Sequence, residues 1–157
     1  MSDWLAATLI VLATVAGMEA VAAVTHRYIM HGWGWGWHRS HHEPRTGRFE
    51  RNDLYALCFA AISIACFGPL SYLVWPGFTW IGLGMVVYGL LYVLLHDGLV
   101  HRRLPLGVPR NRYLKRLVQA HRLHHAVRGR EGCVSFGFLY APPVAKLRAR
   151  LRDTGVL

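Results

Sequence analysis

Three apolar runs of membrane-crossing length constrain this chain more than any other feature. Residues 4–24 carry one charged side chain, Glu19, and residues 54–75 carry none. A third run, residues 77–95, is also uncharged and is joined to the second by Pro76-Gly77. A helix needs about 20 apolar residues to cross the hydrocarbon of a bilayer, so each run is long enough. The sequence predicts transmembrane helices at about 4–25, 54–75 and 77–98, the last two forming a tight helical hairpin.

Length and hydrophobicity fit one membrane domain over residues 1–157, since the hydrophobic content is 54%. A cleaved signal peptide is the alternative for the first run, but the run lacks a basic start and exceeds the typical signal core of about 7 to 15 residues. Residues 133–145 are apolar but too short to cross, so we expect them to dip into the interface or to cover the histidine site. The predicted fold class is an all-α integral membrane protein with three to four transmembrane helices, the fourth only if residues 133–145 re-enter.

Positive charge orients these spans. All eighteen Lys and Arg residues lie within 27–51 or 102–152. By the positive-inside rule both stretches are cytosolic, which places the N-terminus outside. The net charge of +10 is then explained by topology and by anionic lipid headgroups, and not by nucleic acid. The three cysteines form no two-spaced pair, and we expect them to stay reduced.

The ten histidines repeat one pattern twice. H-x4-H is followed by H-x2-H-H within residues 26–42, and again within residues 96–125. Both regions are on the side that the charges mark as cytosolic. The complete set is His26, His31, His38, His41, His42, His96, His101, His121, His124 and His125.

The spacing of these histidines predicts that they converge. Positions i, i+3 and i+4 share one face of an α-helix, so His121, His124 and His125 project together, as do the three histidines of residues 38–42. The H-x4-H pairs fit less well, because five residues turn a regular helix by about 140° beyond a full turn. Those pairs must straddle the site, or the helix must unwind or bulge there.

Ten imidazoles in this pattern indicate a dimetal site. Neutral imidazole is the commonest metal ligand in proteins, and two ions with four or five nitrogens each would use the whole set. Glu43 and Asp97 directly follow histidines, and we expect them to accept hydrogen bonds from ligand ring N–H groups. Imidazole suits Zn, Cu, Fe and Ni, so the spacing predicts two metals without selecting iron.

At this point a resemblance becomes specific. The doubled histidine pattern is similar to that of the membrane di-iron hydroxylases and desaturases of the fatty acid hydroxylase superfamily. The stretches RFERNDLYA, HDGLVHRR and AHRLHHAVRGREGCVSFGFLYAPP resemble the bacterial β-carotene hydroxylases within it. The likeness covers nearly the whole chain, although the repetitive linker GWGWGW departs from what we expect there.

This resemblance implies a non-haem di-iron monooxygenase of the bacterial inner membrane. It would hydroxylate C3 of the β-ionone rings of β-carotene, giving β-cryptoxanthin and zeaxanthin, and also convert canthaxanthin to astaxanthin. Two Fe ions would be the cofactors, with Zn as a substitute in a purified sample, and O2 would be the co-substrate. Electrons would come from reduced ferredoxin and its NAD(P)H-dependent reductase, which agrees with the lack of a G-x-G-x-x-G signature in the chain.

A bilayer-dissolved substrate would need an apolar slot below the metals. The residues at suitable helical spacing beneath His26 and His96 are Ala22, Ala23, Gly89 and Tyr92, and small residues there serve either a slot or close helix packing. Glu19 lies almost on the face of His26 and about 10 Å deeper. It is either functional or a protonated carboxyl hydrogen-bonded to a neighbouring helix. The alternating tryptophans of GWGWGW predict an irregular or extended turn with interfacial anchors.

Two alternatives remain. A fatty acid or sterol hydroxylase would use the same chemistry, and only the resemblance around GCVSFGFLYAPP argues against it. A divalent-metal transporter would be of a different class, but it would need ionisable residues along its spans. Only Glu19 meets that requirement.

Overall fold

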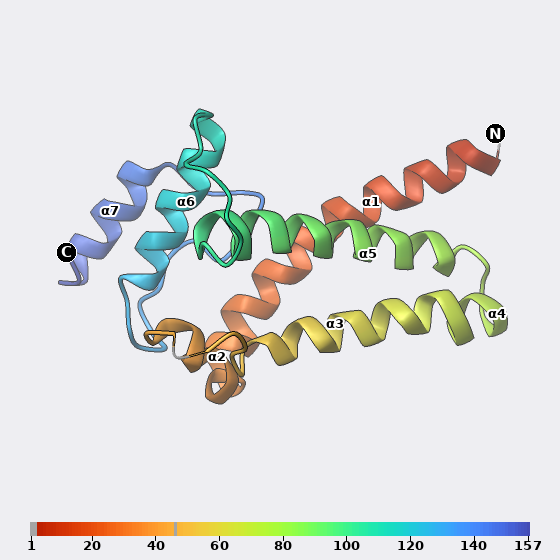
Figure 1. The fold of residues 1–157 in the computed structure, drawn as a ribbon, viewed down its shortest axis with the longest axis horizontal. Helices are drawn as coiled ribbons and strands as arrows, with labels where there is room; N and C mark the ends of the chain where they lie inside the picture. Colours follow the sequence, from red (N-terminus) through yellow and green to blue (C-terminus); the bar gives the residue numbers. More distant parts are fainter. Residues whose placement is uncertain (1–2, 46) are drawn as a thin grey trace.

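Helices and connecting loops make up the whole described part of the chain, residues 3–45 and 47–157, in a computed structural model (Figure 1). Three of the helices pass directly into π-helical turns, labelled η. In chain order the elements are α1 Asp3–Val24, η1 Thr25–Trp33, α2 Trp35–His42, α3 Asp53–Ala65, η2 Cys66–Leu70, α4 Ser71–Leu73, α5 Phe78–Tyr92, η3 Val93–Val100, α6 Arg112–His125 and α7 Val144–Asp153.

Three continuous helices are long and apolar enough to cross a membrane. They run over Asp3–Trp33, Asp53–Leu73 and Phe78–Val100, and only 17% of the residues in the apolar window of each are buried within the protein. Large apolar side chains such as Leu12, Leu57 and Leu90 therefore face outward, as lipid contact requires. The predicted three-span, all-α architecture is confirmed, with the first and third helices extended by π-helical turns beyond their predicted ends at residues 25 and 98.

Helices α3 and α5 lie side by side as the predicted hairpin (Figure 1). The turn between them is closed by backbone hydrogen bonds, among them Trp75 N–H to Leu70 O at 3.1 Å and Phe78 N–H to Trp75 O at 3.0 Å. Helix α1 crosses α5 where Gly84 faces Thr14, and a Cβ at Gly84 would lie 2.5 Å from the Thr14 Cβ. A small residue thus permits the close crossing, as expected for membrane helices.

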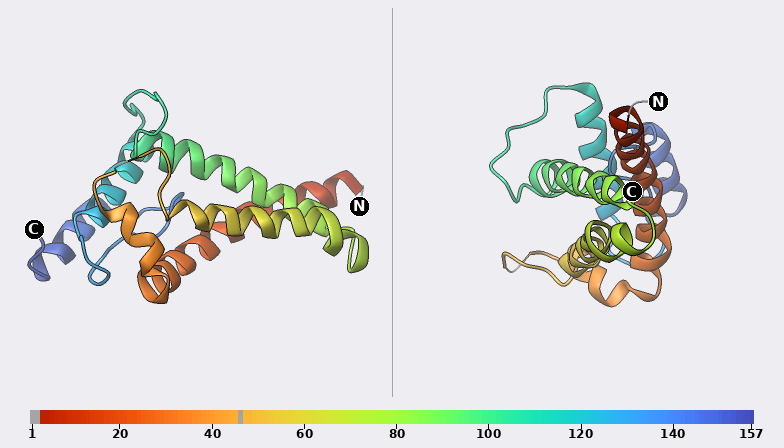
Figure 2. Two further views of the ribbon diagram at one scale, coloured as in Figure 1. Left: turned by 60° about the horizontal axis from the view of Figure 1, so that its bottom comes forward. Right: turned by 90° about the vertical axis from the view of Figure 1, so that its right-hand side faces the viewer.

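The histidine-bearing segments gather at one end of the molecule, away from the N-terminus and the hairpin turn (Figure 2). Helix α6 is amphipathic and packs on α7 through a core that includes Leu117, Ala120, Leu147 and Leu151. Residues 133–143 are not helical and supply Cys133, Val134 and Ala141 to the same core. The expectation that this stretch covers the histidine site matches its contacts, described next.

Candidate metal centre

The ten histidines converge from two distant regions of the chain, η1 with α2 in the first and the end of η3 with α6 in the second. Eight of them are buried, and His101 and His125 are partly exposed. The π-helical turns explain how the H-x4-H pairs reach one site. Hydrogen bonds in such a turn run from residue i+5 to residue i, as from His101 N–H to His96 O at 2.9 Å, which brings the two side chains to one face. The bulge anticipated from the spacing is therefore present.

Two groups of four imidazoles form within this cluster. The first group is His26, His31, His38 and His124, and the second is His41, His96, His101 and His121. In each group the four ligand atoms lie within 4.8 Å of one another. His42 adjoins the first group, with its ring centroid 5.0 Å from those of His31, His38 and His124. His125 adjoins the second, with its Nε2 atom 2.9 Å from that of His121.

The groups do not follow the two sequence repeats. The middle histidine of each H-x2-H-H motif crosses to the other group: His41 joins the second and His124 joins the first. The three histidines of each motif were expected to share one helical face. They do reach the same cluster, but they divide between its two groups. Each group consequently depends on both halves of the chain.

The ring nitrogens show why these groups suit metal ions. Seven histidines place their Nδ1 atom within hydrogen-bond distance of an oxygen acceptor, so Nδ1 carries the proton and Nε2 is left with a lone pair. The acceptors are Phe136 O for His26, Arg130 O for His31, Asn52 Oδ1 for His38, Glu50 Oε2 for His41, Val127 O for His42, Asp97 Oδ1 for His96 and Val134 O for His124.

Those Nε2 atoms point at one another. The distances are 3.1 Å between His26 and His38, 3.1 Å between His31 and His124, and 3.3 Å between His41 and His96. Two unprotonated nitrogens at such a distance repel, unless a cation lies between them. With a metal–nitrogen bond of about 2.1 Å, two ligands at a right angle lie about 3.0 Å apart. The residues therefore fit a pair of metal ions.

Burial keeps these imidazoles neutral, which is the form that binds metal. Loss of solvation lowers the pKa of His38 to about 3 and that of His42 to about 4. The same cause lowers the pKa of His101 to about 3 and that of His125 to about 2. Nearby imidazoles add to the effect, because one charged ring disfavours the next.

His42 Nε2 is a buried atom for which the described residues, 3–45 and 47–157, provide no hydrogen-bond partner. A fifth ligand position in the first group would use it. Cys133 lies close to His42 and His124, but burial raises the pKa of its thiol to about 12. A protonated thiol is a poor ligand, and Cys133 Sγ instead donates to Gly129 O at 3.6 Å.

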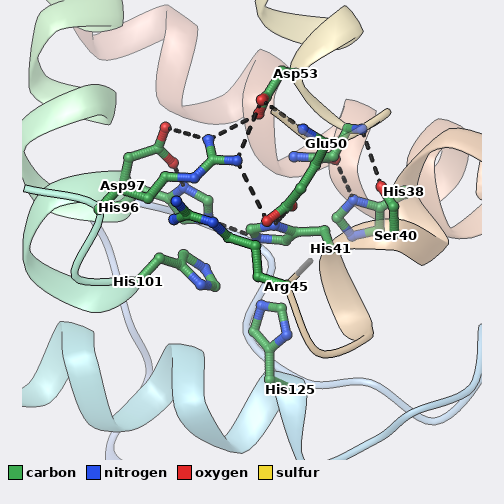
Figure 3. A network of polar contacts seen from close by, with 12 residues as sticks. His38, Ser40, His41, Arg45, Glu50, Asp53, His96, Asp97, His101 and His125 are labelled. Carbon is green, nitrogen blue, oxygen red and sulfur yellow. Dashed lines mark hydrogen bonds and ion pairs between the residues drawn. The ribbon is translucent and has the colours of Figure 1, made fainter. Parts of the chain in front are cut away.

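An arginine bridges the carboxylates behind the second group (Figure 3). Arg103 contacts Asp53 at 2.8 Å, Asp97 at 3.0 Å and Glu50 at 3.3 Å. Glu50 and Asp97 in turn accept from the Nδ1 atoms of His41 and His96 at 3.0 and 2.7 Å. One guanidinium thus fixes two ligand-orienting carboxylates, an arrangement typical of metal sites.

Asp97 takes the place expected of it, but Glu43 does not. Glu43 directly follows the last residue of α2, and its carboxylate pairs at 2.7 Å with the exposed Arg39, four residues before it. His42 instead donates to a backbone carbonyl. Glu50, Asn52, Asp53 and Arg103 were not predicted as site residues. The signal for them was the resemblance of RFERNDLYA and HDGLVHRR, which contain all four.

The GWGWGW linker differs from its prediction. Trp35 begins helix α2, which includes Gly36 and Trp37. The irregular part is confined to Gly32, whose φ and ψ are non-helical within η1, and to the turn at Gly34. Trp35 packs against the first group, with ring centroids 5.2 Å from His31 and 5.3 Å from His42. Helix formation here is driven by that packing and overrides the poor propensity of glycine. Trp33 is 85% exposed, as an interfacial anchor would be.

The residues expected to line a slot lie next to the histidines, but other side chains occupy part of the space beside them. Tyr92 stacks on His96, with ring centroids 4.4 Å apart. Ala22 is buried against Met18 and Tyr88, while Ala23 is half-buried and Gly89 has open space around it. Glu19 hydrogen-bonds to the neighbouring helix through Tyr88, and also to the loop that contains residues 138–140.

On its polar side the second group opens into a cleft of about 690 Å³. His41, His101, His121 and His125 line its floor. Its remaining lining includes four arginines, Arg39, Arg45, Arg122 and Arg128. The centre is therefore reached by water from a basic surface, and its opposite side meets the apolar helices.

Comparison with known proteins agrees with this geometry. The fatty acid hydroxylase family model matches residues 11–141, which is most of the chain. The chain belongs to the fatty acid hydroxylase family. Membership of this family of hydroxylating oxidoreductases confirms the resemblance drawn from the histidine pattern. It also agrees with the interpretation of the histidine cluster as a site for metal ions.

Relatives of this chain include bacterial and plant proteins. The chain is 64% identical over 151 residues to a beta-carotene hydroxylase of Pantoea ananas, covering 96% of this chain and 86% of the relative. It is 58% identical to one of Paracoccus sp. (strain PC1), covering 95% and 93%. It is 43% identical to beta-carotene 3-hydroxylase 2 of Arabidopsis thaliana, covering 69% and 37%. No solved structure matches the chain.

Proposed function

We propose that this chain is a di-iron monooxygenase that hydroxylates C3 of the β-ionone rings of β-carotene, giving β-cryptoxanthin and zeaxanthin. Canthaxanthin, converted to astaxanthin, is a further proposed substrate. The observation that carries the proposal is the double set of inward-facing Nε2 atoms at the end of three membrane-length helices. The identities to beta-carotene hydroxylases support the substrate class.

The proposed reaction balances with one dioxygen for each hydroxyl group. One oxygen atom enters the C3–H bond, and the other leaves as water with two protons and two electrons from a donor. Two iron ions, when bound by the ten histidines, would supply the oxygen-activating chemistry that an unactivated C–H bond requires. The chain itself holds the ligands neutral by burial and orients them through Glu50, Asn52, Asp97 and the backbone carbonyls.

We propose a reduced ferredoxin, served by an NAD(P)H-dependent reductase, as the electron donor. The arginine-lined cleft over the second group supports this, since ferredoxin-type donors are acidic and a basic surface attracts them. We also propose the bacterial inner membrane as the location, with the histidines on the cytosolic side, from the positions of Lys and Arg.

The rival functions have less support. The named relatives are beta-carotene hydroxylases and not fatty acid or sterol hydroxylases. For a divalent-metal transporter, a carboxylate within the spans would have to be free to bind ions. Glu19 already accepts four hydrogen bonds.

Expression in cells that accumulate β-carotene, followed by pigment analysis, tests the proposal. We expect zeaxanthin from the parent chain and none from His38→Ala or His124→Ala, since each removes a ligand of the first group. Glu43→Gln is the matched control, because within residues 3–45 and 47–157 that carboxylate pairs with the exposed Arg39 alone, and it should retain activity. Unchanged β-carotene in cells that express the parent protein would contradict the proposal.

A further inference from the structure

Glu19 holds a distant loop by its backbone. Its Oε1 atom accepts the N–H groups of Phe138 and Tyr140, each at 2.9 Å, and its Oε2 atom accepts that of Leu139 at 3.0 Å. Tyr88 donates its hydroxyl to Oε2 at 2.8 Å. Four donors thus satisfy both oxygens of a carboxylate within an apolar span, where an unpartnered one would be costly.

The loop is shaped for this contact. We call residues 134–141 the strap. A Cβ atom at Gly137 would lie 2.5 Å from Glu19 Oε1 and 2.8 Å from Tyr140 O, so only glycine permits the approach. Ser135 has φ +60°, a region that residues other than glycine seldom occupy. Strain of this kind persists where the surroundings fix the backbone, and here histidine rings hold the carbonyls of Val134 and Phe136 on either side of Ser135.

The strap reaches both histidine groups. The carbonyls of Val134 and Phe136 accept from the Nδ1 atoms of His124 and His26, both in the first group, at 2.9 Å. The Phe138 ring stacks on His26, with centroids 5.4 Å apart and planes within 6°. The Phe138 ring is also nearly perpendicular to the ring of His96 in the second group, with the two centroids 5.0 Å apart. Phe138 therefore lies against both groups at once.

Phe138 covers the side of the cluster that faces the apolar helices. It packs, with Leu139, against the core of Met18, Ala22 and Tyr88. Beside it lies a cavity of only about 10 Å³, lined by His96, His121 and apolar side chains. That volume admits no ring of a hydrocarbon substrate. Phe138, His96 and His121 all line that cavity, so a molecule that enlarged it would contact this side chain beside the histidines.

We propose that Phe138 determines which carbon of an apolar substrate faces the metal centre, and that Glu19 is the positioning residue that sets Phe138 through the strap. This inference rests on the proposed carotenoid hydroxylation for its substrate. The ring of Phe138 acts as a stop for the end group of the substrate, and the carboxylate keeps that stop against His26 and His96 of the two histidine groups.

The first test compares products. Phe138→Ala is expected to release hydroxylated carotenoids substituted at ring carbons other than C3, because the stop is removed, while the protein keeps two metals per chain. Glu19→Gln, which is isosteric but places an amide N–H₂ against backbone N–H groups, is expected to give the same new products in smaller amount. Phe49→Ala, at a phenylalanine that is 88% exposed, is the matched control and should give C3 products alone.

The second test needs no turnover. In the purified, metal-loaded protein, Glu19→Gln is expected to speed amide hydrogen exchange at residues 138–140 by about tenfold or more, with α6 unaffected, since hydrogen bonds to a charged acceptor are lost. Unchanged exchange there would overturn the anchoring role. Unaltered product positions in Phe138→Ala would overturn the specificity role. Loss of metal from both variants would also overturn it, since the strap would then only support ligands. If the parent chain gave no hydroxylated product, the proposed function would be refuted instead. Amide hydrogen exchange at residues 138–140 would still test whether Glu19 anchors the strap.

Discussion

His41 and His96 bring their Nε2 atoms to 3.3 Å of one another although 55 residues separate them along the chain. Each is oriented from behind by a carboxylate, Glu50 for His41 and Asp97 for His96. Arg103 joins the two carboxylates. The second group is therefore assembled from α2, from η3 with the histidine that follows it, and from α6, and it cannot form from either half of the chain alone.

The crossing of His41 and His124 predicts which metal each supports. His41→Ala should deplete the second group and His124→Ala the first, so each variant should retain about one metal per chain and lose hydroxylation. Elemental analysis of the purified protein, with the occupied group identified by diffraction at the metal absorption edge, measures this. If His41→Ala emptied the first group, the assignment of ligands across the repeats would be wrong.

Arg103→Gln should weaken metal binding in the second group more than in the first. Without the guanidinium, Glu50, Asp53 and Asp97 repel one another, and the orientation of His41 and His96 loosens. Loss of such an outer contact typically costs 10- to 100-fold in metal affinity. Competition with a chelator measures the affinity of each site.

Arg39→Gln serves as the control for that experiment. Its ion pair with Glu43 is exposed, and such pairs contribute only about 0 to 1 kcal/mol. Equal effects of the two substitutions would show that the bridge of Arg103 is not specific to the site.

Some of this architecture follows from the sequence because it is local. The spans and the hairpin depend on runs of apolar residues and on Pro76-Gly77, and the structure confirms them. The unwinding between His26 and His31 was one of two options, because a regular helix cannot put residues five apart on one face. The crossing of His41 and His124 was beyond prediction, since it depends on how two helices dock.

Other contacts of the site could not be predicted from residue types, because they use backbone atoms. Four of the Nδ1 acceptors are backbone carbonyls, at Val127, Arg130, Val134 and Phe136. Any residue type provides a carbonyl, so composition cannot identify them. The helical conformation of residues 35–37 differs from the turn that glycine propensity favours, because packing of Trp35 on His31 and His42 decides the conformation.

Gly34→Ala should destabilise the first group through Tyr55. A Cβ at position 34 would lie 2.0 Å from the Tyr55 hydroxyl oxygen and 2.9 Å from Ile29 O, so the turn before α2 would have to shift. We expect a lower melting temperature and reduced metal content. Tyr55→Phe removes the nearest clashing atom, and the double variant should recover part of the loss. No recovery in the double variant would place the strain elsewhere.

Acid should destabilise the metal-free protein. The pKa values of His38, His42 and His101 lie at about 3, 4 and 3 in the folded state, below the ordinary value of about 6.5. Below about pH 6.5 these histidines bind protons in the unfolded chain, whereas in the folded chain they stay neutral until the pH reaches their lower pKa values. Each such histidine then lowers the free energy of unfolding by about 1.4 kcal/mol per pH unit until its folded pKa is reached.

Thermal unfolding of the chelator-treated protein between pH 8 and pH 5 checks this. The melting temperature should stay level above about pH 6.5 and fall steadily below it. A control with His38→Gln should show a shallower fall in melting temperature, because the variant lacks one histidine that binds a proton only in the unfolded chain. A melting temperature that rose on acidification would contradict the burial of neutral imidazoles.

The arginines of the cleft should govern the encounter with the electron donor. Arg122 and Arg128 are exposed, and they line the opening above His101, His121 and His125 without a described carboxylate partner among residues 3–45 and 47–157. Arg122→Glu with Arg128→Glu should raise the KM for an acidic ferredoxin about tenfold or more at low salt, with metal content unchanged. The difference from the parent should shrink as salt rises, because screening weakens the attraction. Arg148→Glu changes an exposed charge on α7 away from the cleft and should leave KM unaltered. If it raised KM equally, net charge and not the cleft would attract the donor.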